Sequence, residues 1–501
     1  MRTHAFFSIR AKRAKRLAAA MAFLLALTFG AQALACTTIL VGKDASATGD
    51  AFFGRTVDVH GLGQVTLVSV PARMRPASWT YVDDNTGLAI DLPARSCQYT
   101  MTPQSLDALE TPGVWAESCI NAYGVSMSAT ESIYANDKAL AADPYVENGI
   151  AESNIPTIVI PYVKTAREGV ERLGTLVEKY GCAESNGVAF GDGKEIWYME
   201  LYTGHQWAAQ RVPDDCYAVI GNDALLGAID LADKANFLAS KDIWTLAEKN
   251  GFLVREADAP HLARTYGAAH RNYSQLRVWA GQKMFSPSLS KKYDVNATFA
   301  AFVKPDERIA LNEVMELMRY RYEDTPYDAN KRDDTRPIGI PRTSQAHIFQ
   351  LRAQKPAILW LSMSSPEFSV FLPLYGDLSG VPESYAKLSP AYDHDSAYWR
   401  FRTLSSLAAL DRDAYGAPVR AHWKAMEMQL MANLPAMDDA YAKSGYAPET
   451  AAALFADIAE QALADADMLT GELLYQIADN AVIDTGASAM ADGDLDDTVI
   501  R

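Results

Sequence analysis

The sequence predicts an α+β protein built from stacked layers of sheet and helix. Segments rich in Thr, Ile and Val, with strand-like alternation, occupy residues 36–72, 115–128 and 187–222, and β character returns at 346–375. One amphipathic helix interrupts these segments at 161–180. Because the strands come in runs rather than singly between helices, we expect stacked layers and not an alternating βαβ fold.

The first strands are predicted directly after residue 35. Cys36–Gly42 is rich in Thr, Ile and Val, a polar turn follows, Ala51–Asp58 returns, and Gln64–Val70 alternates as a further strand. Arg55 and Asp58 stand three residues apart, so a regular strand would send their side chains to opposite faces. Both can serve one site only if the strand bends or ends there.

A tight turn and a helix dominate the next part of the chain. Asn121–Gly124 contains the turn formers Asn and Gly and joins the predicted strands 115–120 and 125–128. The helix is predicted over Pro161–Tyr180, with Pro161 in its first turn and Gly181 at its end. Its apolar stripe consists of Val163, Ala166, Val170, Leu173 and Val177.

The remaining chain becomes increasingly helical. Residues 187–222 are typical of a strand meander, and 230–321 is predicted to be mostly helical. Beyond Pro382 the chain is rich in Ala, Leu and Met with helical spacing to about residue 478. The acidic tail from Asp484 to Asp497 is expected to fray.

Residues 1–35 have the three parts of a secretory signal. A positive region without acidic residues precedes the apolar core Leu17–Thr28, and Ala33-Leu34-Ala35 forms a small-x-small cleavage pattern. The apolar run is shorter than the ~20 residues that a membrane span needs. A lipoprotein signal is a rival, although Ala33 stands where its usual motif has Leu. We expect an exported protein, periplasmic or extracellular, with signal peptidase as its maturation partner.

The mature chain is strongly acidic. Removal of the six basic residues of the leader leaves 40 Lys and Arg against 62 Asp and Glu, a formal charge of −22. Such a surface repels nucleic acid and anionic lipid, so we expect neither a nucleic-acid partner nor stable membrane contact after cleavage. A homo-oligomer is compatible with the sequence, which leaves the oligomeric state open.

The cysteines and histidines do not predict a metal site. No pair of cysteines has C-x-x-C spacing and no H-E-x-x-H occurs, so we expect neither a metal nor another cofactor. In an oxidising compartment the four cysteines other than Cys36 allow one or two disulfides, and the pairing stays open. These four are Cys97, Cys119, Cys182 and Cys216.

Cleavage after Ala35 would make Cys36 the first residue of the mature chain. A thiol with a pKa near 8.5 is only about 3% thiolate at neutral pH. The freed α-amine of the same residue has a pKa of about 7.7–8.0 and can accept the thiol proton at little cost. Cleavage would therefore create a nucleophile and its general base in one residue.

Several segments together resemble the dipeptidase family of N-terminal nucleophile hydrolases, whose wider relatives are penicillin V acylases and bile salt hydrolases. The resemblance is carried by residues 36–42, 54–58, 121–124, 191–197, 212–222 and 273–279. Segments that look specific to the dipeptidase branch are 347–352, 371–375 and 397–400. The long leader is a departure, since many relatives lose only a methionine or a short propeptide.

The resemblance implies a fold and a domain organisation. The family fold is a four-layer αββα sandwich, which agrees with the layers expected here. We therefore predict a signal peptide at 1–35, an N-terminal nucleophile hydrolase domain at 36–381 and a helical C-terminal region at 382–501. Short peptides are the implied substrates.

The resemblance also implies catalytic roles. Cys36 corresponds to the nucleophile, Arg55 to the arginine that favours its thiolate, and Asp58 to the carboxylate that orients the α-amine. Asn121 and Asn222 correspond to positions that bind the developing oxyanion or hold the substrate amide. Arg277 corresponds to a second active-site arginine. The segment 347–352 and Trp360 are taken as scaffold.

The leading hypothesis is an exported cysteine dipeptidase that works through an acyl-enzyme on Cys36. One alternative is an amide acylase of the penicillin V or bile salt hydrolase type. Another is a lipid-anchored periplasmic binding protein, in which acylated Cys36 would have no free α-amine and no turnover would occur.

Overall fold

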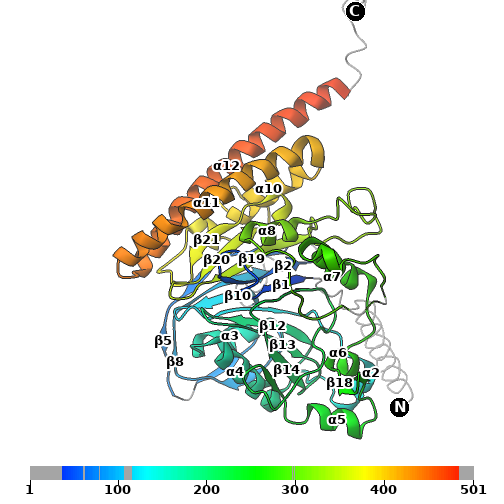
Figure 1. The fold of residues 1–501 in the computed structure, drawn as a ribbon. Coiled ribbons are helices and arrows are strands. Elements are labelled where there is room, and N and C mark those ends of the chain that lie inside the picture. Colours follow the sequence, from blue (N-terminus) through cyan, green and yellow to red (C-terminus); the bar gives the residue numbers. More distant parts are fainter. Residues whose placement is uncertain are drawn as a thin grey trace, which may run out of the picture. The chain divides into compact units, whose positions relative to one another are not determined.

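The computed structural model describes residues 36–59, 63–77, 79–105, 115–295, 297 and 299–484. The predicted leader, residues 1–35, and the predicted tail beyond Asp484 lie outside these ranges. Within them the mixed α+β class is confirmed, because the chain forms two large antiparallel sheets and a helical C-terminal region (Figure 1).

The first large sheet contains the strand that begins at the proposed cleavage site. Its strand order is β15-β1-β2-β19-β20-β21, and every neighbouring pair is antiparallel. All eight residues of β2 are buried, as expected of a strand in the interior of a covered sheet. The bounds are β1 (Thr37–Val41), β2 (Ala51–Asp58), β15 (Tyr217–Ile220), β19 (Thr343–Leu351), β20 (Ile358–Met363) and β21 (Leu372–Tyr375).

The second large sheet has the order β16-β14-β13-β12-β11-β10-β9-β3, with β4 also paired to β9. It confirms the turn at 121–124, where Gly124 has a φ of 78°, and three strands of the predicted meander, whereas the fourth predicted strand, 217–220, is β15 and pairs with β1 in the first sheet. The bounds are β3 (Gln64–Val65), β4 (Val68–Val70), β9 (Tyr99–Ser105), β10 (Trp115–Asn121), β11 (Ser126–Thr130), β12 (Asn186–Gly191), β13 (Ile196–Leu201), β14 (Trp207–Arg211) and β16 (Phe237–Ala239). Small ribbons are formed by β5 (Arg73–Met74) with β8 (Arg95–Ser96), β6 (Thr80–Val82) with β7 (Ala89–Asp91), and β17 (Arg255–Glu256) with β18 (Ala259–Pro260).

Helix α4 (Ala166–Tyr180) packs on β12, β13 and β14, and its predicted start at Pro161 is wrong. Thr165 caps the helix by accepting a hydrogen bond from the Glu168 backbone at 3.1 Å, so the chain turns helical only after it. Pro161 belongs to a preceding 3₁₀ turn, η1 (Ile160–Tyr162). The predicted end is confirmed, because Gly181 has a φ of 75°. Helices α2 (Asp137–Ala142) and α3 (Ile155–Val159) precede α4.

The prediction that 230–321 is mostly helical is only partly correct. Long irregular connections separate four helices, because the chain between α7 and α8 contains Pro287 and Pro305, which cannot donate helix hydrogen bonds. The helices are α5 (Ile243–Lys249), α6 (Leu262–Tyr266), α7 (Asn272–Phe285) and α8 (Leu311–Arg319), with the short η2 (Pro287–Leu289) after α7.

The C-terminal helices share the hydrophobic core of the six-stranded sheet. Figure 1 shows α10, α11 and α12 on the side of β20 and β21, and the three helices contact these strands. Their bounds are α9 (Glu383–Ala386), α10 (Ala397–Ala408), α11 (Ala417–Lys443) and α12 (Pro448–Asp484), with η3 (Pro366–Phe368) and the π-helix η4 (Arg412–Gly416) between strand and helix segments. In the part of the chain that the structure describes, no helix is both long and apolar enough to cross a bilayer.

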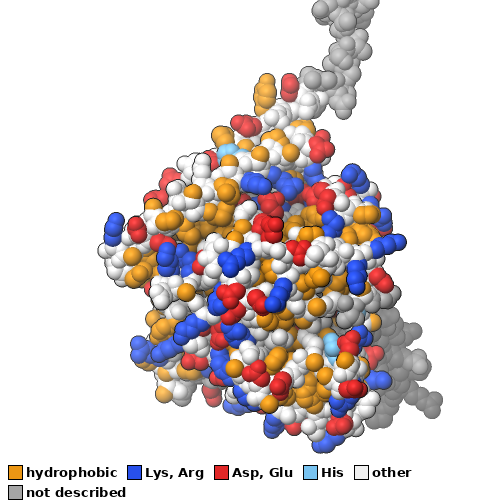
Figure 2. All heavy atoms as spheres, in the orientation of Figure 1, with side chains coloured by type: hydrophobic (Ala, Val, Ile, Leu, Met, Phe, Trp, Pro, Cys, Tyr) orange, Lys and Arg blue, Asp and Glu red, His pale blue; other side chains and the backbone are white. Residues whose placement is uncertain are grey.

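Charged side chains of both signs are interspersed on the face drawn in Figure 2. Lys and Arg lie next to Asp and Glu over both the sheet region and the C-terminal helices. Surface ion pairs among the described residues include Lys387 with Asp393 at 2.9 Å. The acidic excess of the sequence is therefore distributed and does not form one uniform acidic patch on this face.

Candidate active site

Cys36 lies at the start of β1, next to Arg55 on the neighbouring strand β2. The Arg55 guanidinium donates a hydrogen bond from Nη1 to the Cys36 thiol at 3.4 Å, and both residues are buried. The antiparallel register places Thr38 opposite Arg55 and Thr37 opposite Thr56. The pairing of the first two strands thus brings together two residues that are nineteen positions apart in the sequence.

Arg55 reaches across to the second sheet. Its Nη1 donates to Glu152 at 3.0 Å, its Nη2 donates to the Glu117 carboxylate and to the Glu117 carbonyl at 3.0 Å, and its Nε donates to Ser128 at 3.1 Å. Ser128 Oγ in turn lies 2.9 Å from Nε2 of His347. Burial, and then the positive charge of Arg55, lowers the pKa of His347 well below its usual value, so this histidine is neutral.

The two glutamates cannot both be charged beside one arginine without cost. Burial, and next the charge of Glu152, raises the pKa of Glu117 well above its usual value. Glu117 therefore holds a proton, and Arg55 donates to both carboxyl groups. A buried cation held in this way stays fixed beside the thiol.

The thiol is protonated when Cys36 is joined to Ala35 by a peptide bond. Burial raises the pKa of Cys36 to about 11, Arg55 opposes this shift, and Asp58, Glu152 and Glu117 add to it. In this chain Ala35 precedes Cys36, so the α-nitrogen of Cys36 is a neutral amide rather than an amine. Without a charge on that nitrogen, Arg55 alone does not offset the burial of the thiol.

Asp58 joins the same site although it stands only three residues after Arg55. It is the last residue of β2, and the partner strand β19 has an irregular register between Thr343 and Gln345 at this point. Its buried carboxylate accepts a hydrogen bond from Thr343 Oγ1 at 2.6 Å and pairs with Arg336. A regular strand would point the side chains of Arg55 and Asp58 to opposite faces. Because β2 ends at Asp58, both side chains can belong to one site.

Arg277 and Asn222 hold the main chain of the nucleophile. Arg277, on α7, donates from Nη1 to the Cys36 carbonyl and to Thr37 Oγ1, the latter at 3.0 Å. Its Nη2 donates to the Asn222 side-chain oxygen, and the Asn222 backbone donates to Ser274 Oγ at 2.8 Å. Burial, and then Arg336, lowers the pKa of Arg277 to about 9.

The structure does not place Asn121 with the other predicted site residues. Its side-chain nitrogen donates to the carbonyls of Ile160 and Val163 at 2.9 and 2.8 Å, and its oxygen accepts from the backbone of Tyr123 and Val125, both at 3.0 Å. These four bonds use the whole hydrogen-bonding capacity of the amide. We therefore assign Asn121 to stabilising the turn and omit it from the catalytic set.

The position of Asn121 in the fold agrees with this assignment. Asn121 borders a cavity that also includes Arg352 and Tyr375. Arg352 follows Leu351, which pairs with Ala51 at the start of β2, whereas Cys36 lies beside the other end of β2. Asn121 is thus at the opposite end of the six-stranded sheet from the thiol.

Sequence reasoning missed the partners of the predicted site residues. Glu117 carried one signal, because a charged residue within an otherwise apolar and small-residue strand is unusual unless it is paired. Glu152 and Arg336 lie in polar loops, and no local pattern distinguishes them from surface residues. Their roles follow only from the contacts that the two sheets and the connecting loops create.

The structure contains no disulfide: all five cysteines are free thiols, and Cys36, Cys119, Cys182 and Cys216 are buried. In the described ranges, no three side chains of His, Cys, Asp or Glu are arranged to hold a metal ion.

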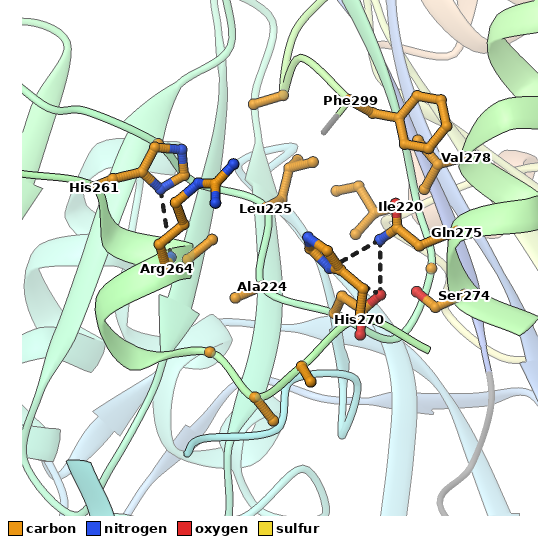
Figure 3. Close-up of a pocket in the computed structure, with 18 of the residues that line it drawn as sticks. Ile220, Ala224, Leu225, His261, Arg264, His270, Ser274, Gln275, Val278 and Phe299 are labelled. Atoms are coloured by element: carbon orange, nitrogen blue, oxygen red, sulfur yellow. Dashed lines mark hydrogen bonds and ion pairs between the residues drawn. The ribbon is translucent and has the colours of Figure 1, made fainter. Parts of the chain in front are cut away.

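A cavity of about 430 Å³ adjoins the site behind Asn222. Gly221 and Asp223 line it, and so do Ser274 and Gln275 of α7. In Figure 3 His270 and Gln275 point toward each other, and the Gln275 nitrogen lies 3.1 Å from His270 Nδ1 and 2.9 Å from Asp223. His261 and Arg264 lie at the other side of this cavity (Figure 3).

The model of one known family covers most of the sequence. Peptidase family C69 matches residues 35–425, a range that begins one residue before Cys36 and includes every residue of the site. The chain belongs to peptidase family C69. As a C69 peptidase it is a peptide hydrolase of a cysteine-peptidase family.

Curated relatives of this C69 peptidase cover most of its length. A protein named probable dipeptidase B from Streptococcus pyogenes serotype M3 is 33% identical over 428 residues, which are 81% of this chain and 85% of the relative. One named probable dipeptidase A from serotype M1 is 35% identical over 441 residues, 80% of this chain and 90% of the relative. Another named probable dipeptidase A, from serotype M3, is 36% identical over 404 residues, 75% and 83% of the two chains.

Proposed function

We propose that this C69 peptidase is an exported cysteine dipeptidase that hydrolyses short peptides through an acyl-enzyme on Cys36. One observation carries the proposal: the thiol beside the predicted cleavage site receives a hydrogen bond from a buried arginine at 3.4 Å. The names of the curated relatives support dipeptides as the substrate class. The family match favours a peptidase over an amide acylase or a binding protein.

The proposed mechanism begins with removal of residues 1–35 by signal peptidase in the periplasm or outside the cell. The freed α-amine of Cys36 then takes the thiol proton, and the thiolate attacks the scissile carbonyl carbon. Asp58 orients the α-amine, and Arg55 stabilises the thiolate. The α-ammonium returns its proton to the leaving amine, and water then hydrolyses the acyl-enzyme.

Asn222 and Arg277 are proposed to support the tetrahedral intermediate. Arg277 fixes the Cys36 carbonyl and orients Asn222 through its side-chain oxygen. The side-chain N–H of Asn222 is proposed to donate to the developing oxyanion. A four-layer αββα sandwich of the N-terminal nucleophile type is part of the proposal, supported by the bonds of Arg55 across two sheets and by helices packed on each sheet.

Two measurements test this function. Mass spectrometry of the exported protein should find Cys36 as the first residue, with an unmodified α-amine. The same preparation should hydrolyse dipeptides but not penicillin V or taurine-conjugated bile salts.

A pair of cysteine variants tests the role of the thiol. Cys36→Ser should abolish most turnover, whereas Cys97→Ser, which changes a half-buried cysteine outside the site, should retain it. Acylation of the mature terminus, or activity on acyl amides alone, would overturn the proposal.

A further inference from the structure

Within the described residues, the carboxylate of Glu131 beside the thiol site makes no hydrogen bond or ion pair. Glu131 directly follows β11, and its backbone N–H donates to Glu152 Oε2 at 2.7 Å. The other oxygen of Glu152 accepts from Arg55 Nη1 at 3.0 Å, and the same Nη1 donates to the Cys36 thiol at 3.4 Å. This short series of contacts places Glu131 at the border of the site.

The surroundings of Glu131 contain more carboxylate oxygens than donors. Within the described residues its half-buried carboxylate makes no hydrogen bond or ion pair, and one oxygen of the fully buried Glu117 also lacks a hydrogen-bond partner. Glu184 lies near it but is occupied, because it accepts from the backbone of Glu152 at 2.7 Å. Burial, then Glu184 and Glu152, raises the pKa of Glu131 to about 8. A positively charged donor would relieve this excess.

Guanidinium groups also lie close to Cys36. Arg336 pairs with Asp58, and within the described residues its Nε is buried without a hydrogen-bond partner. Arg342 is close enough to Asp58 and Cys36 for their charges to act on it, while burial lowers its pKa. Arg277 holds the Cys36 carbonyl. Carboxylates and guanidinium groups therefore both border the thiol, and a substrate that carries one charged group of each sign would match them.

A dipeptide has the complementary charge pattern. Its α-ammonium is separated from the scissile carbonyl carbon by the α-carbon alone, so the group that binds the ammonium has to border the nucleophile. Its α-carboxylate belongs to the other residue and extends to the opposite side. Internal peptides and N-acylated peptides lack the ammonium at this position.

We propose that Glu131 binds the α-ammonium of the substrate and so restricts hydrolysis to peptides with a free amino terminus. The inference rests on the proposed function and adds to it a specificity-determining residue. A charge-assisted hydrogen bond to this ammonium would form on binding and hold the scissile carbonyl over the thiol.

The test compares three substrates: Ala-Ala, N-acetyl-Ala-Ala and Ala-Ala amide. Glu131→Gln keeps the shape of the side chain but cannot ionise to the carboxylate that would pair with the bound ammonium. We expect the KM for Ala-Ala to rise by about 10- to 100-fold, the range of one charged hydrogen bond. The preference for Ala-Ala over the N-acetyl substrate should fall by the same factor, while the preference over Ala-Ala amide stays unchanged. Glu131→Asp should restore part of the preference, and Glu178→Gln on the exposed face of α4 should match the wild type.

A binding measurement keeps the inference falsifiable if turnover is lost. Calorimetry with the processed Cys36→Ala protein should detect Ala-Ala binding. In the double variant that also carries Glu131→Gln, the dissociation constant for Ala-Ala should rise by the same factor of about 10 to 100. An unchanged preference for the free amino terminus in folded Glu131→Gln, or unchanged Ala-Ala affinity, would overturn the inference while leaving the dipeptidase proposal intact. Failure of the wild type to hydrolyse any dipeptide would instead overturn the proposed function.

Discussion

At the scale of single residues, the chemistry of Cys36 depends on which charges lie around it. Arg55 is the one cation that donates to the thiol in the described structure, and it is already shared with Glu117 and Glu152. Burial raises the thiol pKa to about 11, because this shared arginine does not offset it. Cleavage would add an ammonium group to the same residue, which is the nearest place for a second positive charge.

The first prediction concerns thiol reactivity. Iodoacetamide should alkylate Cys36 at pH 7.5 at least about 10-fold faster in the processed protein than in a chain that keeps Ala35 before it. The reason is that, at a pH below the pKa, lowering the thiol pKa by one unit raises the thiolate fraction about tenfold. In the unprocessed chain the rate should still be rising at pH 9–10, since the raised pKa shifts thiolate formation to higher pH. Peptide mapping follows the reaction, with half-buried Cys97 as an internal reference; equal rates at Cys36 would contradict the prediction.

The second prediction separates the two asparagines that the sequence grouped together. Asn222→Ala should lower kcat/KM by about 10²- to 10³-fold, the effect of losing one oxyanion donor. Asn121→Ala should lower the free energy of unfolding by about 1–3 kcal/mol, because it leaves buried backbone groups unpaired, while kcat/KM changes by less than about threefold. Urea denaturation and steady-state kinetics on both variants provide the comparison. A stable Asn121→Ala protein with a large loss of kcat/KM would return Asn121 to the catalytic set.

At the scale of elements, the closeness of α4 to its sheet depends on two glycines. A methyl group at Gly174 would overlap the Trp207 ring, and one at Gly169 would overlap Phe190. Without these side chains the helix backbone can lie directly on the aromatic side chains of β12 and β14. Helix propensity alone would favour alanine at both positions.

The third prediction follows from this packing. Gly174→Ala should lower the free energy of unfolding by about 1–3 kcal/mol, because overpacking outweighs the gain in helix propensity. The matched control is Gly471→Ala on α12, where a methyl group meets no atom within 4 Å and the same substitution should stabilise by about 0.5–1 kcal/mol. Thermal unfolding of the two variants measures the difference. Stabilisation of both would show that α4 can move away from the sheet.

At the scale of the whole molecule, the C-terminal helices are tied to the sheets by buried ion pairs. Glu427 of α11 accepts from Arg319 Nη1 at 3.0 Å and from the Phe371 backbone at 2.8 Å. Arg352 donates to Asp438 of the same helix at 2.7 Å, and Tyr375 donates to that carboxylate at 2.9 Å. These contacts fix α11 over β21 and the segment that leads into it.

The fourth prediction tests how much the largest of these contacts contributes. Glu427→Ala should lower the free energy of unfolding by about 3–5 kcal/mol, because it leaves Arg319 buried without its counter-charge. Asp395→Ala removes an exposed partner of Lys387 and should cost less than about 1 kcal/mol. Urea denaturation of both variants gives the two values. A small effect of Glu427→Ala would mean that the helical region contributes little to the stability of the sheets.

Much of the local structure could be predicted from the sequence. The strands around Cys36 and Arg55, the turn at 121–124 and the end of α4 at Gly181 depend on residues within a few positions of one another. The predicted start of α4 at Pro161 was wrong, because the helix begins only after its cap at Thr165, although a proline is compatible with a first helical turn. The long helical stretch expected at 230–321 was overestimated because composition alone does not show where irregular connections are stabilised by distant contacts.

The sequence by itself predicted a cysteine directly before a strand, with Arg55 and Asp58 on the next strand, and the structure confirms this arrangement. Only the tertiary structure decided which groups surround that cysteine: Arg55 with Glu117 and Glu152, and Asp58 with Arg336. It also separated Asn121 from Asn222. The physical reason is that a buried charge is governed by the groups within a few ångströms of it, and here the packing of two sheets supplies those groups from distant parts of the chain.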